Sequence, residues 1–208
     1  KQYGLRSSGE KASMFLNGDI FTADAEEPAL VEKLLSINHS GNAYKIIWQH
    51  SNAGKTHGFT INAIKRSEKE TSLQLNWNGS PLDISNTGSE TLTVPAIGDF
   101  KVLNVATVND AQQYASVQFS NPIAVGQDLT GLITVSNQTD VSYTINGSEV
   151  KLFIGGKADG NYTVNVNAGI KDSWGTSLTN SFTANVVFEN RLPSVKIHGK
   201  GNILPSSG

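Results

Sequence analysis

One segment of the sequence, NAGIKDSWGTSL, places residue types that could do chemistry side by side. Lys, Asp and Ser follow one another from residue 171, and they could act as base, acid and nucleophile in a hydrolytic site. Gly169 and Gly175 bound this group, so the backbone can turn sharply on either side of it. The segment is therefore either a catalytic loop or a turn that ends one strand and starts another.

Other catalytic signals are missing from the sequence. No G-x-S-x-G elbow occurs, so a Ser-His-Asp arrangement lacks its strained serine turn. The segment SNAGKT, residues 51–56, resembles the end of a phosphate loop, but it lacks the first glycine and its pattern predicts a β-hairpin. We therefore expect no catalytic residues, no bound cofactor and no enzymatic activity.

Histidines and acids are the candidate metal ligands. His50 and His57 flank SNAGKT and could face each other across paired strands, but metal sites usually need a third protein ligand, and none lies nearby in the sequence. His198 is expected to be solvated. The acids between Asp19 and Glu27 lack the alternating oxygen spacing of a calcium loop and suit a helix N-terminus better. We expect no metal site.

Composition excludes several classes of protein. The 208 residues include no cysteine, which excludes disulfides, thiolate metal sites and a thioester within this chain. The net charge is −2 and the basic residues are scattered, so there is no basic surface pattern for nucleic acid. No apolar run approaches the roughly 20 residues of a membrane span, and the first ten residues lack the apolar core of a signal peptide.

Period-2 alternation dominates from Phe100 onward and predicts antiparallel β-structure. The alternating runs are FKVLNVATV, YASVQF, LITVS, VSYTI, EVKLFI, YTVNVNA and SFTANVVF. Asn146-Gly147 lies between two of them and predicts a hairpin with a type I′ turn, which needs two residues at positive φ. Short strands separated by turn signals at this spacing are typical of a β-sandwich.

The first half is less regular but also predicts strands, in MFLNGDIF, AYKIIWQH, HGFTINAIKR, TSLQLNW and ETLTV. The segment DAEEPALVEKLL differs, because its apolar residues recur at helical spacing. Asp24 is its N-cap candidate, and Pro28 comes early in its first turns. The apolar stripe consists of Leu30, Val31, Leu34 and Leu35. We expect a short helix packed on the end of a sandwich.

The two halves of the chain resemble each other. FTINAI parallels YTVNVNAGI, NWNGSPL parallels DSWGTSL, DIFTADAEEP parallels VQFSNPI, and LLSIN parallels LITVS. Pro95 and Gly98 break the pattern between the copies. The sequence thus predicts two tandem antiparallel β-sandwiches at residues 1–96 and 97–190. Residues 191–208 would be a linker or strand that leads to a further domain.

The ordered set VQFSNPI, LTGLITV, NGSEVKLFI and GNYTVNVNAGIKDSWGTSLTNSFTANVVF resembles a bacterial immunoglobulin-like domain. Such domains occur in adhesins, surface-layer proteins and enzyme spacers, so the resemblance leaves function open. It implies that NAGIKDSWGTSL is a structural segment of the domain. Its turn and core signature would be made by Gly169, Asp172, Trp174, Gly175 and Leu178. Asp172 would accept local backbone hydrogen bonds, and Asp172→Ala would cost about 1 kcal/mol of stability.

The tail ENRLPSVKIHGKGNILPSSG, together with the block that runs from GDIF through EPALVEKLL and IKR to Trp77, resembles the N-terminal region of bacterial α2-macroglobulins of the Bacteroidetes type. That resemblance implies a macroglobulin-like, non-catalytic anchoring arm of a protease-trapping inhibitor. The parent would be a lipoprotein in the periplasm or at the cell surface of the cell envelope. Its partners would be further domains of the same chain and, through the whole protein, proteases. No nucleic acid partner is expected.

A second interpretation is a surface immunoglobulin-like adhesin or glycan-binding module, and a third is a spacer of a secreted glycoside hydrolase. Three tryptophans, Trp48, Trp77 and Trp174, could stack on sugar rings, although each lies beside a predicted strand and suits a core or sheet-end position. The sequence does not identify a target protease, a membrane or an oligomeric state.

Overall fold

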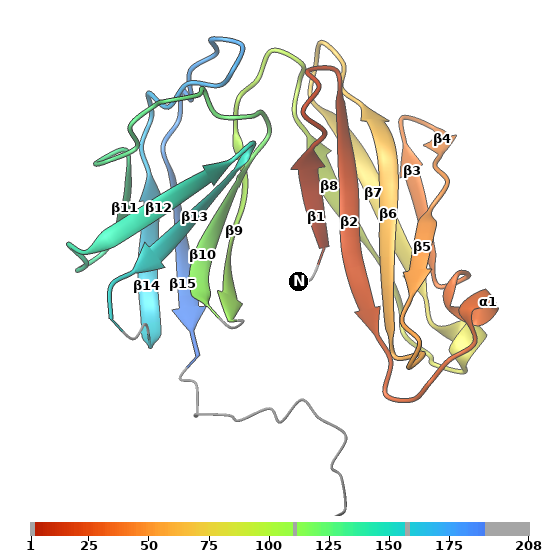
Figure 1. The fold of residues 1–208 in the computed structure, drawn as a ribbon. Coiled ribbons are helices and arrows are strands. Elements are labelled where there is room, and N and C mark those ends of the chain that lie inside the picture. Colours follow the sequence, from red (N-terminus) through yellow and green to blue (C-terminus); the bar gives the residue numbers. More distant parts are fainter. Residues whose placement is uncertain (1–2, 110–111, 157–158, 190–208) are drawn as a thin grey trace, which may run out of the picture.

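The alternating segments of the first half form a sandwich of two four-stranded antiparallel sheets in the computed structural model, which describes residues 3–109, 112–156 and 159–189 (Figure 1). Its strands are β1 (Tyr3–Ser7), β2 (Ser13–Phe21), β3 (Leu35–His39), β4 (Asn42–Ala43), β5 (Ile47–His50), β6 (Thr56–Lys65), β7 (Thr71–Asn78) and β8 (Thr87–Val94). One sheet has the order β1-β2-β6-β5 and the other the order β4-β3-β7-β8.

The second half forms a smaller sandwich. Its strands are β9 (Val102–Asn109), β10 (Gln113–Phe119), β11 (Ile133–Val135), β12 (Val141–Asn146), β13 (Glu149–Ile154), β14 (Gly160–Val166) and β15 (Phe182–Phe188). The order β12-β13-β10-β9 in one sheet and β11-β14-β15 in the other is that of a constant-type immunoglobulin sandwich. The first sandwich has the same order with β4 added, so the predicted all-β tandem fold is confirmed.

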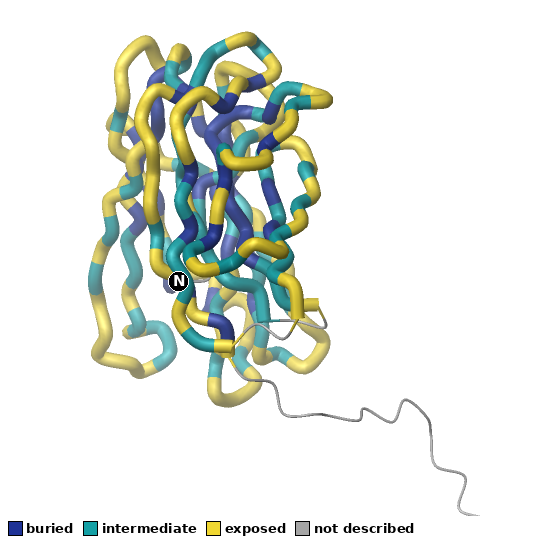
Figure 2. Tube along the Cα trace, turned by 90° about the vertical axis from the view of Figure 1, so that its left-hand side faces the viewer, coloured by how far each residue is buried: buried dark blue, intermediate teal, exposed yellow. Residues whose placement is uncertain are grey.

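Each sandwich has its own apolar core, made by the inward-facing residues of its strands. The first core includes Leu16, Ile61 and Leu73, and the second is centred on Phe119 and Phe188, all with essentially no exposed surface. Buried segments alternate with exposed ones along the strands, while loops at both ends are exposed (Figure 2). The predicted division after residue 96 lies between the last residue of the first core and the first residue of the second. The predicted linker at 191–208 lies outside the described residues.

The two sandwiches lie side by side because the chain reverses at the linker. In Figure 1, β8 rises to the linker and β9 runs back down along β1. Leu103 of β9 packs against the core of the first sandwich. From β1, Arg6 comes near enough to Glu149 and Tyr114 of the second sandwich for their charges to raise its pKa, against the larger lowering by burial. The described chain therefore begins and ends towards the same side, away from the linker.

The predicted helix is shorter than the pattern suggested. It forms only α1 (Pro28–Val31), its N-cap is Glu27 rather than Asp24, and that cap makes no side-chain hydrogen bond. Leu35 of the predicted stripe is the first residue of β3, where it pairs with Trp77. Pairing with a partner strand outweighed the local helical spacing. A 3-10 turn, η1 (Ser80–Leu82), packs beside α1.

The predicted hairpin at Asn146-Gly147 is present, but the turn differs. Asn146 pairs with Glu149 as part of the β12–β13 ladder, so the two-residue loop is Gly147-Ser148. Gly147 has a φ of 59°, and Asn146 is not among the residues at positive φ. A positive φ at the first loop position alone is the pattern of a type II′ turn, so the expected type I′ turn is wrong.

The two sandwiches share a strand order, as the internal repeat predicted, but one of the predicted sequence matches pairs strands that are not equivalent. DIFTADAEEP and VQFSNPI include the ends of the equivalent strands β2 and β10. LLSIN covers all but the last residue of β3, and LITVS contains the equivalent strand β11. FTINAI, however, lies in β6, whose equivalent is β13, whereas YTVNVNAGI forms β14. Both strands alternate in the same way, so the pattern alone did not distinguish them. The sequence pattern also did not predict β1.

Candidate functional site

The segment NAGIKDSWGTSL forms most of the loop from β14 to β15, and it folds back on itself so that Lys171 pairs with Ser177 in an antiparallel bridge. Gly169 and Gly175 have φ values of 101° and 85°, which suit glycine. Leu178 is 3% exposed and belongs to the second core, while Trp174 is half-buried. The hydroxyl of Ser173 faces the backbone carbonyls of Pro122 and Ile123. The serine therefore points away from Asp172 to a backbone contact.

Asp172 is the most heavily bonded residue of this turn, and its side chain is buried at 1% exposure. Its Oδ1 accepts hydrogen bonds from the backbone N–H groups of Trp174 and Thr176, at 2.9 and 2.7 Å. These are the local bonds that the sequence suggested. Its Oδ2 accepts a 2.6 Å bond from Nδ2 of Asn121, which the sequence did not suggest. The turn is thereby tied to the end of β10.

Asn121 connects the turn to the other sandwich. It is fully buried, and its Nδ2 also donates to the backbone carbonyl of Asp99 in the linker. Its Oδ1 accepts a 2.7 Å hydrogen bond from Nη1 of Arg66, which follows β6 in the first sandwich. A continuous chain of hydrogen bonds thus runs from Arg66 through Asn121 to Asp172.

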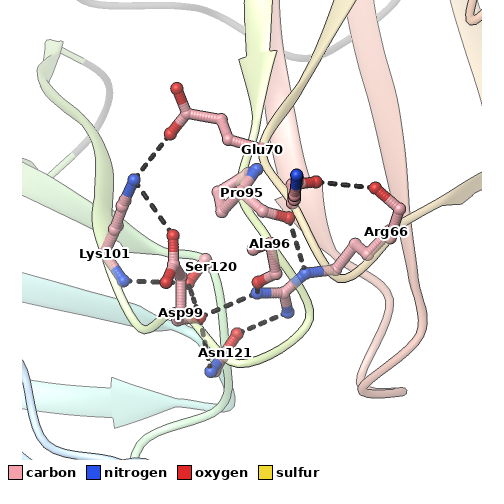
Figure 3. Close-up of polar contacts among 10 residues, drawn as sticks. Arg66, Glu70, Pro95, Ala96, Asp99, Lys101, Ser120 and Asn121 are labelled. Atoms are coloured by element: carbon pink, nitrogen blue, oxygen red, sulfur yellow. Dashed lines mark hydrogen bonds and ion pairs between the residues drawn. The ribbon is translucent and has the colours of Figure 1, made fainter.

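Arg66 is the centre of the junction, and Figure 3 shows its guanidinium pointing into the linker. Only 6% of the residue is exposed. Besides Asn121, it donates to four backbone carbonyls, those of Lys11, Pro95, Ala96 and Asp99. A guanidinium has five N–H donors, so every donor has a partner. Three of these carbonyls belong to the linker, and their positions are therefore set by one side chain of the first sandwich.

Burial lowers the pKa of Arg66, while the charges of Asp99 and Asp172 act in the opposite direction. Among the described residues, the hydrogen-bond partners of the guanidinium are carbonyl and amide oxygens and not carboxylates, so carbonyl dipoles carry most of the local compensation. A second, exposed contact joins the sandwiches nearby. Nζ of Lys101 lies 2.6 Å from Glu70 of the first sandwich and 3.1 Å from Asp99 (Figure 3), and these contacts raise its pKa.

A groove runs between the sandwiches below this junction. One part, of about 330 Å³, is lined by β1, β8 and the start of β9. A larger part, of about 550 Å³, is lined by β1, β2 and the rest of β9, and Tyr3 and Asn104 line both parts. The larger part combines planar polar side chains, such as those of Arg6 and Asn17, with Phe21, which is 59% exposed.

The histidines take three different positions. His50 and His57 pair directly across β5 and β6, with their Nδ1 atoms 2.8 Å apart. His57 is fully buried, and burial, followed by the charge of His50, lowers its pKa. His39 is also buried and contacts Tyr44 and Thr71, and burial lowers its pKa. His198 lies outside the described residues.

Groups of three or more His, Cys, Asp or Glu side chains placed to hold a metal ion do not occur among the described residues. Within the same part of the chain, no helix is long and apolar enough to cross a membrane. Trp77 lies at the end of β7, with its Nε1 bonded to Asn86, and Trp48 is half-buried beside Phe59.

Sequence reasoning missed both Arg66 and Asn121. Arg66 ends the run IKR, where it looked like an ordinary surface charge, and Asn121 precedes a proline in a turn. One local signal was available. Ile64 faces inward, so the alternation of the strand predicts that the residue two positions later also faces inward, and that residue is Arg66. Their partners are 22 to 55 residues away, so no local pattern could pair them.

The comparisons with known proteins bear mainly on the second sandwich. Residues 91–189 match the family model of a bacterial Ig-like domain. No match was found among curated proteins.

Three solved structures show weak similarity to the chain. The Bacteroides ovatus mixed-linkage glucan utilization locus protein SGBP-B, solved with a mixed-linkage heptasaccharide, has 15% identity and a TM-score of 0.35 over 88% of this chain and 42% of that one. Yersinia pseudotuberculosis InvD has 10% identity and a TM-score of 0.26 over 95% and 60%. The endo-fucoidan hydrolase MfFcnA4 of glycoside hydrolase family 107 has 15% identity and a TM-score of 0.24 over 84% and 26%.

These TM-scores carry no argument about function, and this chain spans less than half the length of the first of those structures. Neither the family match nor these three structures points to an α2-macroglobulin. Residues 91–189 are thus similar in sequence to a bacterial Ig-like domain, and the second sandwich has the seven-strand topology of a constant-type immunoglobulin fold.

Proposed function

We propose that this chain is a non-catalytic two-domain module of a bacterial surface protein, which holds the parts joined to it in a fixed orientation. The observation that carries the proposal is the buried guanidinium of Arg66. Four of its five donors bond to Asn121 of the second sandwich or to carbonyls of the linker, and the fifth bonds to the carbonyl of Lys11 in the first sandwich. A flexible pair of domains would not need such a group, because swinging apart would leave a charge and several carbonyls without partners.

The linker supports the same conclusion. Pro95 and Ala96 are buried, and Ile97 donates its backbone N–H to the carbonyl of Ser67 in the first sandwich. Phe100 is already part of the second core. The chain therefore passes from one sandwich to the other without a free segment, and relative motion of the domains would break buried contacts.

The side-by-side arrangement suggests what the module does mechanically. Two sandwiches stacked end to end would add length, as a spacer does. Here the chain folds back at the linker, so the described ends lie towards one side (Figure 1). Such a module adds little length and serves instead to set a direction between attached segments.

The test is the relative motion of the two sandwiches in solution. Residual dipolar couplings of the amide groups should fit one common alignment tensor for both sandwiches in the unaltered chain. In Arg66→Met, the two sandwiches should require separate tensors. Lys65→Met, at the exposed neighbouring position, should behave as the unaltered chain does. Separate tensors for the unaltered chain would contradict the proposal.

A glycan-binding module is the second candidate, and the groove between the sandwiches favours it. Carbohydrate sites combine an aromatic surface with planar hydrogen-bonding side chains. The groove offers exposed Phe21 beside Arg6, Asn17 and Asp19 on one wall, and Asn104 on the other. A rigid junction would keep these walls at a constant separation.

This second function is tested with an array of bacterial and plant glycans. A specific glycan should bind the unaltered chain, lose at least tenfold in affinity in Phe21→Ala, and bind normally to Ile47→Ala. Ile47 is a similarly exposed apolar residue, 51% against 59%, outside the groove. Binding that is insensitive to Phe21→Ala would place any glycan site elsewhere.

A finer form of the main proposal is that the parent protein is a periplasmic or surface-exposed, lipid-anchored α2-macroglobulin-like protease inhibitor. It is supported by the sequence resemblance alone. The parent sequence beyond residue 208 tests it. Many further β-domains and a Cys-x-x-Gln thioester motif would support the inhibitor, whereas a barrel with paired acids or further identical Ig-like repeats would contradict it.

A further inference from the structure

The pair His50 and His57 closes the β5–β6 hairpin on the first sandwich, at the opposite end of β6 from Arg66. The two residues are direct partners in the antiparallel ladder, and their rings meet edge-on with centroids 5.1 Å apart. Their Nδ1 atoms lie 2.8 Å from each other. His57 is fully buried, while 17% of the His50 side chain is exposed. The pair is therefore enclosed on one side and open to solvent on the other.

The hydrogen-bond partners determine which nitrogen of His57 carries its proton. Nε2 of His57 lies 3.4 Å from Oγ1 of Thr22. The Thr22 hydroxyl donates to the backbone carbonyl of Asp24 at 2.6 Å, so it can only accept from the histidine. This contact is satisfied when His57 holds its proton on Nε2. In the neutral ring, Nδ1 then carries a lone pair, and that lone pair faces His50.

His50 is constrained in the same way. Its Nε2 lies 3.4 Å from Oε1 of Glu32, and a carboxylate oxygen accepts but does not donate. The ring also stacks on Trp48, with an interplanar angle of 8°. Neutral His50 therefore also presents a lone pair on Nδ1. Two such lone pairs 2.8 Å apart repel each other, and a cation between them, either a proton or a metal ion, removes that repulsion.

We propose that His50 and His57 bind a divalent transition-metal ion through their Nδ1 atoms. In protein metal sites, the second ring nitrogen of a ligating histidine almost always donates to a carboxylate or another oxygen, which fixes the tautomer. Both rings have that arrangement here, with Glu32 behind one and Thr22 behind the other. Imidazole ligands suit zinc, copper and nickel.

Two protein ligands leave coordination positions for water, which can enter from the exposed side of His50. Because a structural zinc site has four protein ligands, the site should bind less tightly than one of those. A bound ion would link β5 to β6 beside the loop that contains α1. From the sequence, two histidines without a third ligand predicted no metal site. The oxygen atoms that contact the outer nitrogen of each ring are brought there only by the fold.

The experiment uses Zn²⁺ and the full chain with His198→Asn, which removes the one histidine outside the described residues. At pH 7.5, calorimetry should show one zinc ion per chain. The ¹⁵N resonances of Nδ1 in His50 and His57 should shift on zinc addition, while their Nε2 resonances keep the signature of a protonated nitrogen. Zinc at about a hundredfold excess over Kd should raise the Tm by roughly 5 °C.

His50→Asn should abolish the zinc effect on Tm, and Glu32→Gln should weaken zinc binding about tenfold by removing the negative charge of the partner of Nε2. His39→Gln, at the third described histidine, should leave zinc binding unchanged. The proposal is overturned if zinc leaves both Nδ1 resonances unmoved, because the cation between the rings is then a proton alone. It is equally overturned if zinc binding survives His50→Asn. The Nδ1 measurement needs no variant at the pair, so it decides even where a substitution prevents folding.

Discussion

Nη1 of Arg66 donates a 2.7 Å hydrogen bond to Oδ1 of Asn121, and this bond joins the end of β6 in one sandwich to the end of β10 in the other. Both residues are buried. The bond continues through Asn121 to Asp172, so the signature turn of the Ig-like domain is coupled to the domain before it. The junction is therefore a single hydrogen-bonded network that includes residues of both domains.

Arg66→Met should lower the free energy of unfolding by about 3 kcal/mol, because it leaves buried carbonyls of the linker without donors. Urea denaturation followed by circular dichroism measures this. Lys65→Met, at an exposed position one residue earlier, should change stability by less than about 0.5 kcal/mol. Equal effects of the two substitutions would show that the network contributes nothing specific.

Asp172→Asn and Asn121→Asp should each cost about 2 kcal/mol. The first places two amide donors face to face, and the second places two carboxylates 2.6 Å apart. The double variant restores a donor opposite an acceptor, so it should be more stable than the sum of the single effects predicts, by more than about 0.5 kcal/mol. A double-mutant cycle in urea measures the coupling, and strict additivity would contradict the bond.

From the sequence alone, Asp172→Ala is expected to lower the free energy of unfolding by about 1 kcal/mol, the value for one side-chain-to-backbone hydrogen bond. The structure gives this buried carboxylate three bonds, to Trp174, Thr176 and Asn121. The cost should therefore rise to about 3 kcal/mol. The same urea denaturation distinguishes the two values.

Tyr3 should make stability depend on pH in the alkaline range. Burial raises the pKa of its hydroxyl to about 12, aided by its hydrogen bond to Glu90 and by the charge of that carboxylate. The folded chain thus keeps a proton that the unfolded chain releases near pH 10. The contribution to stability is fully present below pH 10 and is lost as the pH rises towards 12.

Urea denaturation between pH 9 and 12 should therefore show a steeper loss of stability for the unaltered chain than for Tyr3→Phe. The two curves should differ by a constant amount below pH 9. The same slope in both proteins would mean that Tyr3 does not titrate differently in the folded and unfolded states.

Gly88→Ala should destabilise the first sandwich by about 2 kcal/mol, the scale of overpacking. A Cβ at this position would lie 2.5 Å from Cζ2 of Trp77, so the indole ring must move. Near-ultraviolet circular dichroism and tryptophan fluorescence should change together with stability. Gly4→Ala, in β1 where a Cβ would meet nothing within 4 Å, should leave both signals unchanged.

Local chemistry determined most of the secondary structure of this chain. Alternation placed most of the strands, and turn residues located the hairpins at SNAGKT and Asn146-Gly147. The division into two sandwiches followed from the repeat and from Pro95. These features depend on neighbouring residues, so a single sequence contains enough information for them. The apolar stripe that ends at Leu35 predicted a longer helix. Leu35 instead pairs with Trp77 in the sheet, so strand pairing outweighed the local helical pattern.

Only the tertiary structure decided how the two sandwiches lie and what joins them. Arg66 meets Pro95, Ala96, Asp99 and Asn121 only after both sheets have folded and the linker has reversed the chain. Likewise, the sequence placed His50 opposite His57, but the oxygens of Glu32 and Thr22 reach the outer nitrogens only through packing. The physical reason is that a buried charge or lone pair is satisfied by whichever groups the fold brings near, and those groups have no fixed spacing along the chain.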